Sequence, residues 1–279
     1  MSTKDTLSEA NLRPKKRFGQ HFLADERILQ RILAAAEVGP EDIVLEIGPG
    51  LGSLTRALAG RARLVLGVEI DEQLVALLCQ QLSASSHVRI VAGDIMAVDI
   101  VRLLEAEIPD LSAYKVVANI PYNITAGLLR RLLEASRRPQ LIVLMVQHEV
   151  AQRITAAPGQ MSLLSVSVQF YGRPRVIHRV PAGAFYPPPK VDSAIVRIDP
   201  HEQLPLVETE VDAFFAVVRA GFSQRRKQLR NALAGGLRRQ QEEITAALVA
   251  SGIAEQRRAQ TLSMAEWLAL YRALCAPRG

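Results

Sequence analysis

Three glycines at alternate positions, Gly48, Gly50 and Gly52, constrain this chain more than any other feature. They follow the apolar run Ile43–Ile47, which contains one acid, Glu46, and they lead into a helical pattern. A buried parallel strand, a tight turn and a helix start produce such a pattern. Because the backbone must turn sharply and admit a ligand, glycine is required there. The sequence therefore predicts a nucleotide-type cofactor site.

The spacing of the glycines leaves three interpretations of that site. A dinucleotide fingerprint needs a glycine three residues after Gly50, where Ser53 stands. Glu46 suits a ligand that carries an ammonium group, because a buried carboxylate needs a cationic or donor partner. The pattern E-x-G-x-G-x-G resembles the first motif of S-adenosylmethionine-dependent methyltransferases. A nicotinamide enzyme and a ligand-free structural turn are the alternatives.

Length and composition limit the class of protein. A chain of 279 residues can bury one sizeable core and a smaller second domain. It has no apolar run near the ~20 residues of a membrane span and no signal-peptide core, so we expect a cytoplasmic protein. Cys79 and Cys275 are far apart and are expected to be reduced thiols. The net charge of +6 comes mostly from arginine and indicates a nucleic-acid partner, although a merely basic surface explains it equally well.

Acids follow two further predicted strands. Glu69 ends an apolar run 21 residues beyond Gly48, where the carboxylate of a doubly wound sheet faces a cofactor ribose. Asp94 follows the run that starts at residue 88 and can accept from an adenine amine, with Ile70 and Met96 on either side of the ring. Capping of a strand or helix end is the alternative for both acids.

The tetrapeptide Asn119-Ile120-Pro121-Tyr122 follows a fourth predicted strand. Proline fixes an extended chain and removes a donor, so the carbonyls nearby face outward. The amide oxygen of Asn119 and the carbonyl of Ile120 can accept the two hydrogens of an exocyclic amine while Tyr122 stacks on its ring. Phe185, which precedes three prolines, would clamp a flipped base against Tyr122, each stack contributing ~1–3 kcal/mol. A structural turn and a core phenylalanine are the alternatives.

Seven strands are predicted before residue 200 and only helices after it, which indicates two domains. We expect an α/β fold of the Rossmann-like type, with a seven-stranded, mostly parallel sheet over residues 1–200, of which 1–12 are disordered. Residues 201–279 form a small all-helical domain. Its helix over 224–235 places Arg226, Lys227 and Arg230 on one face that can track phosphates, unless this is only a solvated surface. Residues 13–23 are expected to dock on the body, over the cofactor.

These motifs in this order resemble the ribosomal RNA adenine N6,N6-dimethyltransferase family, and within it the bacterial small-subunit branch, over residues 13–275. The matching segments are Phe18-Gly19-Gln20-His21-Phe22-Leu23, Glu46-Ile47-Gly48-Pro49-Gly50-Leu51-Gly52, Asn119-Ile120-Pro121-Tyr122, Phe185-Tyr186-Pro187-Pro188-Pro189-Lys190-Val191-Asp192-Ser193-Ala194 and Gln224-Arg225-Arg226-Lys227. His21 and Ile120 stand where many members have Asn and Leu. Gln160-Met161-Ser162 departs from the family pattern and puts an RNA contact there in doubt.

The resemblance implies a class I methyltransferase that uses S-adenosylmethionine, releases S-adenosylhomocysteine and needs no metal. It implies cofactor contacts at His21, Leu23, Gly48, Glu69, Asp94 and Asn119. The expected substrate is small-subunit ribosomal RNA in an immature subunit, at two adjacent adenosines near the 3′ end, and the enzyme is expected to be a monomer. The side chains expected to contact RNA are Arg17, Arg225, Arg226, Lys227 and Arg230.

The expected reaction is direct in-line methyl transfer to adenine N6, performed twice, without a covalent enzyme intermediate or a strong general base. A non-catalytic RNA-binding assembly factor is one rival, and a nicotinamide oxidoreductase is another. Relatives that methylate large-subunit RNA and confer antibiotic resistance share Asn-Ile-Pro-Tyr. The triple proline and the basic helical domain favour the small-subunit branch.

Overall fold

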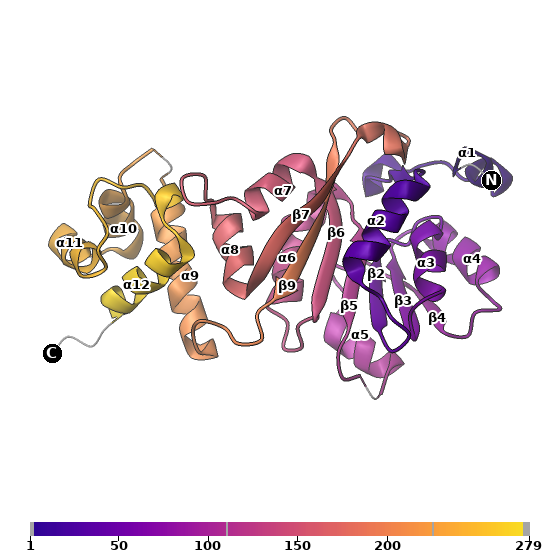
Figure 1. The fold of residues 1–279 in the computed structure, drawn as a ribbon, viewed down its shortest axis with the longest axis horizontal. Coiled ribbons are helices and arrows are strands. Elements are labelled where there is room, and N and C mark those ends of the chain that lie inside the picture. The colour runs from indigo at the N-terminus through magenta and orange to yellow at the C-terminus, as the bar shows by residue number, and fades with distance from the viewer. Residues whose placement is uncertain (1–2, 110, 225, 276–279) are drawn as a thin grey trace. The chain divides into compact units, whose positions relative to one another are not determined.

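A computed structural model describes residues 3–109, 111–224 and 226–275, so Arg225 lies outside the described residues. The chain forms two compact units, residues 1–151 with 174–200, and residues 152–173 with 201–279 (Figure 1). The sequence predicted a single change of unit near residue 200, whereas the structure also groups 152–173 with the second unit. Within the described ranges, no helix combines the length and the apolar character needed to cross a membrane.

A seven-stranded sheet forms the centre of the first unit, in the order β4-β3-β2-β5-β6-β9-β7. Its strands are β2 (Ile43–Ile47), β3 (Leu64–Glu69), β4 (Val88–Ala92), β5 (Lys115–Asn119), β6 (Leu141–Gln147), β7 (Gly172–Val180) and β9 (Ser193–Pro200). The pairs from β4 through β6 are parallel, and β9 runs antiparallel to β6. The predicted seven-stranded, mostly parallel sheet is therefore confirmed.

Helices flank the sheet. They are α1 (Thr3–Glu9), α2 (Glu26–Ala36), α3 (Ser53–Ala59), α4 (Glu72–Gln81), α5 (Ile100–Glu107), α6 (Thr125–Leu133) and α7 (His148–Ile154). Figure 1 shows α2 and α3 in front of the strands and α6 behind them. Asp25 caps α2 by accepting from the main-chain N–H of Arg27 at 2.9 Å.

The position of β2 at the middle of the sheet explains its composition. Val44 and Leu45 are fully buried because the strand has a neighbour on each edge, β3 and β5, and layers on both faces. The order of the strands reverses between β2 and β5, since the chain proceeds outward from β2 in both directions. Ligands of such sheets bind at this reversal, outside the carboxyl ends of the strands.

The N-terminal segment differs from the sequence-based expectation. Residues 1–12 were expected to be disordered, yet Thr3–Glu9 forms α1. Leu7 is only 4% exposed because it packs in a cluster with Phe22, Leu51 and Leu74. Further on, β1 (Phe22–Leu23) pairs antiparallel with β8 (Phe185–Tyr186) to form a second small sheet. Strands of two residues carry no periodic signal, so the sequence did not predict them.

The second unit is helical, as expected. It contains α8 (Leu163–Tyr171), α9 (Glu208–Phe222), α10 (Leu229–Leu237), α11 (Gln241–Ala250) and α12 (Met264–Cys275). Its core is aromatic: the Phe170 ring lies 5.0 Å from that of Phe214 and 5.2 Å from that of Phe215. These pairs stabilise the packing of α8 on α9 beyond the area they bury.

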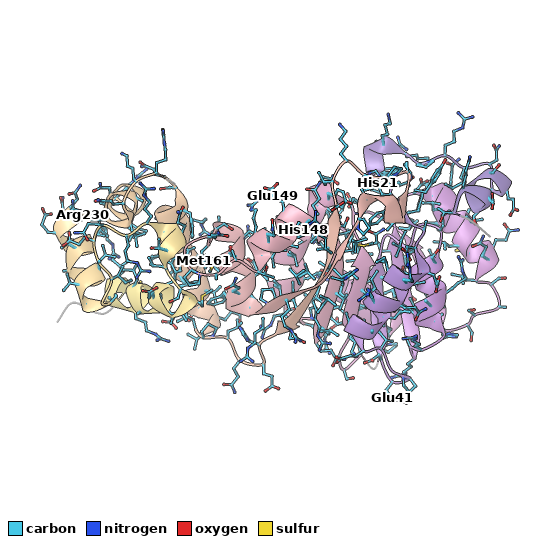
Figure 2. The ribbon with its side chains drawn as sticks, turned by 45° about the horizontal axis from the view of Figure 1, so that its top comes forward. His21, Glu41, His148, Glu149, Met161 and Arg230 are labelled. Atoms are coloured by element: carbon cyan, nitrogen blue, oxygen red, sulfur yellow. The ribbon has the colours of Figure 1, made fainter. Side chains whose placement is uncertain are left out.

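The prediction that Arg226, Lys227 and Arg230 share one helical face is wrong. Helix α10 begins at Leu229, whose main-chain N–H donates to the carbonyl of Arg257 at 2.8 Å. Arg226 and Lys227 therefore precede the helix and share no helical face with Arg230. The Arg230 guanidinium, labelled in Figure 2, donates to Glu255 at 2.9 Å.

Candidate active site

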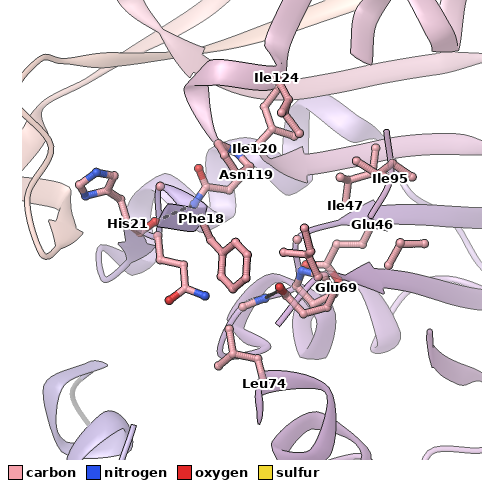
Figure 3. Close-up of a pocket in the computed structure, with 18 of the residues that line it drawn as sticks. Phe18, His21, Glu46, Ile47, Glu69, Leu74, Ile95, Asn119, Ile120 and Ile124 are labelled. Atoms are coloured by element: carbon pink, nitrogen blue, oxygen red, sulfur yellow. Dashed lines mark hydrogen bonds between the residues drawn. The ribbon is translucent and has the colours of Figure 1, made fainter. Parts of the chain in front are cut away.

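A cavity of about 240 Å³ opens at the carboxyl ends of β2, β3 and β5. This volume is slightly below the ~300–1,000 Å³ typical of small-molecule sites. All ten predicted cofactor contacts line it: His21, Leu23, Glu46, Gly48, Gly50, Glu69, Ile70, Asp94, Met96 and Asn119. Ile120, Pro121 and Tyr122 line it as well, and Figure 3 shows several of these side chains around the space. Phe185 is not among the lining residues.

The glycine turn requires glycine for two separate reasons. Gly50 and Gly52 have φ angles of 61° and 78°, in the left-handed region that side chains disfavour. A Cβ on Gly52 would also lie 2.6 Å from a methyl carbon of Leu78, and one on Gly50 would lie 3.1 Å from the Phe22 ring. The turn is thus tight in conformation and closely packed.

Glu46 is a buried carboxylate without full compensation. It is 1% exposed, and its Oε2 atom makes no hydrogen bond to the described part of the chain. Burial raises the pKa of Glu46 to about 8, an effect that the Thr55 hydroxyl only partly offsets. A cationic or donor group in the cavity would supply the missing partner.

Glu69 ends β3 and is held by the main chain. Its two carboxylate oxygens accept from the N–H groups of Gly50 and Asp71, each at 3.0 Å. Burial raises the pKa of Glu69, although these N–H groups oppose the shift. The carboxylate is therefore fixed against the glycine turn, and its contact with a ribose stays a prediction.

Asp94 organises the loop after β4. Its Oδ1 atom accepts from the N–H of Met96 at 2.8 Å, and its carbonyl accepts from Ala97 and Val98 at 2.9 Å. Ile70 also lines the cavity, and its side chain is 42% exposed. An exposed apolar side chain beside an Asp-centred loop fits a flat ring with an amine at its edge.

Asn119 ends β5 and has a defined orientation. Its Nδ2 atom donates to the carbonyl of His21 at 3.1 Å (Figure 3). Because a carbonyl only accepts, the amide nitrogen faces His21 and Oδ1 faces away, with no hydrogen bond to the described residues. The site thus presents a free amide oxygen, as the tetrapeptide predicted.

The Tyr122 hydroxyl is hydrogen-bonded, and its ring faces His21 instead of the expected Phe185. The hydroxyl lies 2.8 Å from the Ser193 hydroxyl, and burial raises the pKa of Tyr122. The His21 ring lies 6.1 Å from the Tyr122 ring at an interplanar angle of 18°. Nδ1 of His21 must carry its proton, since it donates to the Pro187 carbonyl at 2.7 Å.

The predicted clamp between Phe185 and Tyr122 is not formed in this structure. Phe185 is 4% exposed and belongs to a hydrophobic core cluster with Val180 and Ile195. Its strand β8 pairs with β1, and this pairing directs the ring inward. The structure supports the alternative of a core phenylalanine, and His21 takes the position opposite Tyr122.

A strap formed by residues 15–23 covers the cavity, which confirms that this segment docks on the body. Nζ of Lys15 and Nε2 of Gln20 donate to the carboxylate of Asp71 at 2.7 and 2.9 Å. Burial tends to raise the pKa of Asp71, yet these bonds lower it below its usual value. Sequence reasoning missed this contact, because nothing in the sequence connects residues 56 positions apart.

Two further polar side chains lie outside the cavity, whereas Arg17 lines it. His148 and Glu149 begin α7, and neither lines the cavity; Figure 2 shows both, with His21. Arg17 lines the cavity rim, with its guanidinium carbon 4.5 Å from the centre of the Phe18 ring. Across the described residues, no group of three or more His, Cys, Asp or Glu side chains is placed to hold a metal ion.

The charges of the cavity select the ligand class. Glu69 and Asp94 line it together with Glu46, whose raised pKa would fall beside a cation, so a cationic ligand is favoured and a pyrophosphate beside the glycine turn is disfavoured. The residues fit a nucleoside that carries a positive charge near Glu46. The free oxygen of Asn119 can accept from an amine that approaches the same space.

Comparisons with known proteins agree with this chemistry. The profile of the ribosomal RNA adenine dimethylase family matches residues 11–274. The chain is 47% identical over 265 residues to ribosomal RNA small subunit methyltransferase A of Dehalococcoides mccartyi, covering 95% of this chain and 89% of the relative. It is 46% identical to the protein of that name from Moorella thermoacetica, covering 96% and 95%.

Two solved structures are similar along most of the chain. The 23S rRNA methyltransferase ErmE has a TM-score of 0.73 at 30% identity, covering 91% of this chain and 99% of its own. A dimethyladenosine transferase from Plasmodium falciparum has a TM-score of 0.76 at 26% identity, covering 90% and 96%.

Proposed function

The chain belongs to the ribosomal RNA adenine dimethylase family, and we propose that it transfers methyl groups to N6 of two adjacent adenosines near the 3′ end of small-subunit ribosomal RNA. Relatives at 46–47% identity are named for the small subunit, whereas the 23S enzyme is 30% identical, which favours the small-subunit branch over the large-subunit alternative. Family membership also removes the nicotinamide alternative.

The methyl donor is S-adenosylmethionine, which when bound supplies a methyl group activated by a positively charged sulfur and leaves as S-adenosylhomocysteine. Glu46 would hold its ammonium end, because that carboxylate is buried and lacks a partner on one oxygen. Glu69 would accept from the ribose, and Asp94 from the adenine amine between Ile70 and Met96. Three acids in one cavity support this assignment.

The fixed amide of Asn119 carries the proposal for the target base. An adenine amine is a weak nucleophile because its lone pair is delocalised into the ring. Oδ1 of Asn119 and the Ile120 carbonyl would accept its two hydrogens, which favours a more tetrahedral nitrogen with a localised lone pair. His21 holds the amide in this orientation, so no reorganisation is needed when the base arrives.

The rings at the mouth of the cavity would receive the flipped base. Tyr122 is anchored by Ser193 and His21 by Pro187, so both rings are held before the RNA binds. Once methylated, the nitrogen is acidic enough to release its proton to water, so no buried base is required. Positioning then accounts for most of the rate.

Basic side chains on both units would contact the RNA. Arg226 and Lys227 are exposed and available to phosphates, whereas Arg230 is already engaged by Glu255. Arg17 is proposed as a contact at the cavity rim, and Arg225 remains an expectation. The proposed partner is an immature small subunit in the cytoplasm, bound by a monomer.

Mass spectrometry of ribosomal RNA tests the proposal. Small subunits that lack the modification are incubated with the protein and isotopically labelled methyl donor. The expected product is two adjacent N6,N6-dimethyladenosines in small-subunit RNA. Unmodified large subunits are incubated in parallel, and label in their RNA but not in small-subunit RNA would overturn the substrate assignment. Binding without label would support the non-catalytic assembly factor.

A further inference from the structure

Helix α6 contacts two parts of the active site: the target-base motif that ends at Tyr122, and the loop that follows β4. It begins at Thr125, directly after Tyr122–Ile124, and the Thr125 hydroxyl donates to the Tyr122 carbonyl at 3.2 Å. Four leucines fix the helix in the core, each no more than 1% exposed: Leu128, Leu129, Leu132 and Leu133. A helix anchored in this way cannot move independently of the motif from which it starts.

Arg131 extends from this helix to the loop that follows β4. Its Nη1 atom donates to the Met96 carbonyl at 2.7 Å and its Nη2 atom to the Val98 carbonyl at 2.6 Å. Hydrogen bonds from an ionised donor are stronger than neutral ones, and the planar guanidinium reaches two carbonyls at once. Asp94 stabilises this loop by a hydrogen bond within it, and Arg131 stabilises it by hydrogen bonds from α6.

Gly127 lies one turn before Arg131 and brings the same helix face close to Met96. A Cβ on Gly127 would lie 2.9 Å from the terminal methyl carbon of Met96. The helix therefore touches this loop at two points that are four residues apart, which places them on one face. Arg131 itself does not line the cofactor cavity.

We infer that Arg131 is a positioning residue for the methyl donor. It holds the loop of Asp94 and Met96 in place against the adenine ring, and it ties that loop to the helix that starts at the target-base motif. This role rests on the proposed function, because it requires an adenine ring beside Asp94. Arg131 acts through the loop and not by contact with the ligand.

The direct test is the affinity for S-adenosylhomocysteine, measured by titration calorimetry on the full chain. Arg131→Met is expected to raise the Kd roughly tenfold, a change of the size that loss of charged hydrogen bonds produces. Arg131→Lys keeps the charge but reaches fewer acceptors, so a smaller rise is expected. At saturating donor, turnover on small subunits should stay within about twofold of wild type, since the target motif is unchanged.

Arg102→Met is the matched control. Arg102 lines the same surface hollow as Arg131 and is 86% exposed, and its ion pair is with Asp99, not with the loop carbonyls. The same loss of charge there should leave the Kd unchanged. An equal rise in both variants would show a general electrostatic effect and would overturn the inference.

A double-mutant cycle separates positioning from a general loss of stability. In an Asp94→Ala background the loop no longer holds the adenine amine, so removing Arg131 should change the Kd by less than about threefold. Gly127→Ala provides a second variant, because it crowds Met96 while alanine favours the helix. It should raise the Kd without lowering the Tm.

Two results would contradict the inference. One is a folded Arg131→Met protein with the wild-type Kd, and the other is a tenfold rise that persists in the Asp94→Ala background. If Arg131→Met cannot be purified, Arg131→Lys and Gly127→Ala take its place, and wild-type affinity in both overturns the inference. Absence of binding by the wild-type protein would instead contradict the proposed function.

Discussion

The side-chain nitrogen of Asn119 donates to the main-chain oxygen of His21 across 3.1 Å, and this bond joins the end of β5 to the N-terminal strap. The acceptor is a main-chain oxygen, so either histidine or asparagine at position 21 can preserve this hydrogen bond. The strap therefore orients the amide that is proposed to aim the target amine. Covering the cavity and orienting the amide depend on the same segment.

Glu46 should make the stability of the ligand-free protein depend on pH. Unfolded, this carboxyl loses its proton near pH 4.5, whereas in the fold it keeps it to about pH 8. Its contribution to stability is therefore full below pH 4.5 and is lost as the pH rises to about 8. Relative to wild type, Glu46→Gln should gain stability over that range, by an amount on the order of 4 kcal/mol at pH 8. Thermal melts from pH 5 to 9 check this, and parallel curves for the two proteins would refute it.

Asp71 should control how firmly the strap covers the cavity. Asp71→Asn can still cap α4 but loses the ion pair with Lys15, which should weaken donor binding by roughly three- to tenfold at a small cost in Tm. Because the pKa of Asp71 is lowered in the fold, its contribution is present at neutral pH and is lost as the pH falls below about 4. Asp25→Asn, at a helix cap without strap contacts, is the control for calorimetry and for limited proteolysis of the strap. Equal effects of the two substitutions would argue against a strap role.

Ser193 should act on the target base through Tyr122. The Ser193 side chain is fully buried and its hydroxyl meets that of Tyr122 at 2.8 Å. Ser193→Ala and Tyr122→Phe each remove this bond, so their effects on turnover should overlap, with a coupling of about 1 kcal/mol. Donor affinity should not change. Additive losses in single-turnover assays would mean that the hydrogen bond does not hold the ring in place.

Phe185 should matter for folding more than for transfer. Phe185→Leu is expected to reduce the free energy of unfolding by about 1–2 kcal/mol, as for other changes of core volume, and to alter kcat/KM for small subunits only a few-fold. His21→Ala keeps the main-chain bond to Asn119 but removes the ring opposite Tyr122, so it should reduce kcat/KM more. The reverse order in matched assays would restore Phe185 as the clamp.

The sequence predicted those parts of the protein that depend on local patterns. Apolar runs predicted all seven strands of the main sheet. The glycine spacing and the acids at strand ends predicted the cavity lining, because parallel strands bring their carboxyl ends to one edge.

Features that depend on distant contacts were missed or misjudged. The start of α10 is set by Arg257, far along the chain, so the predicted helix began too early. Leu7 is ordered by packing with Leu51 and Leu74, which a polar N-terminal sequence does not reveal. The inward direction of Phe185 follows from pairing between two strands of two residues each.

The central claim is that the Asn119 amide oxygen aims the target amine, and single-turnover methyl transfer by Asn119→Ala tests it most directly. Unmodified small subunits and labelled donor report the transfer rate, while calorimetry with S-adenosylhomocysteine reports cofactor binding on the same preparation. The account predicts a loss of at least about a hundredfold in rate, the size seen when a preorganised polar group is removed, with a Kd within about threefold of wild type. A wild-type rate in Asn119→Ala would contradict the account.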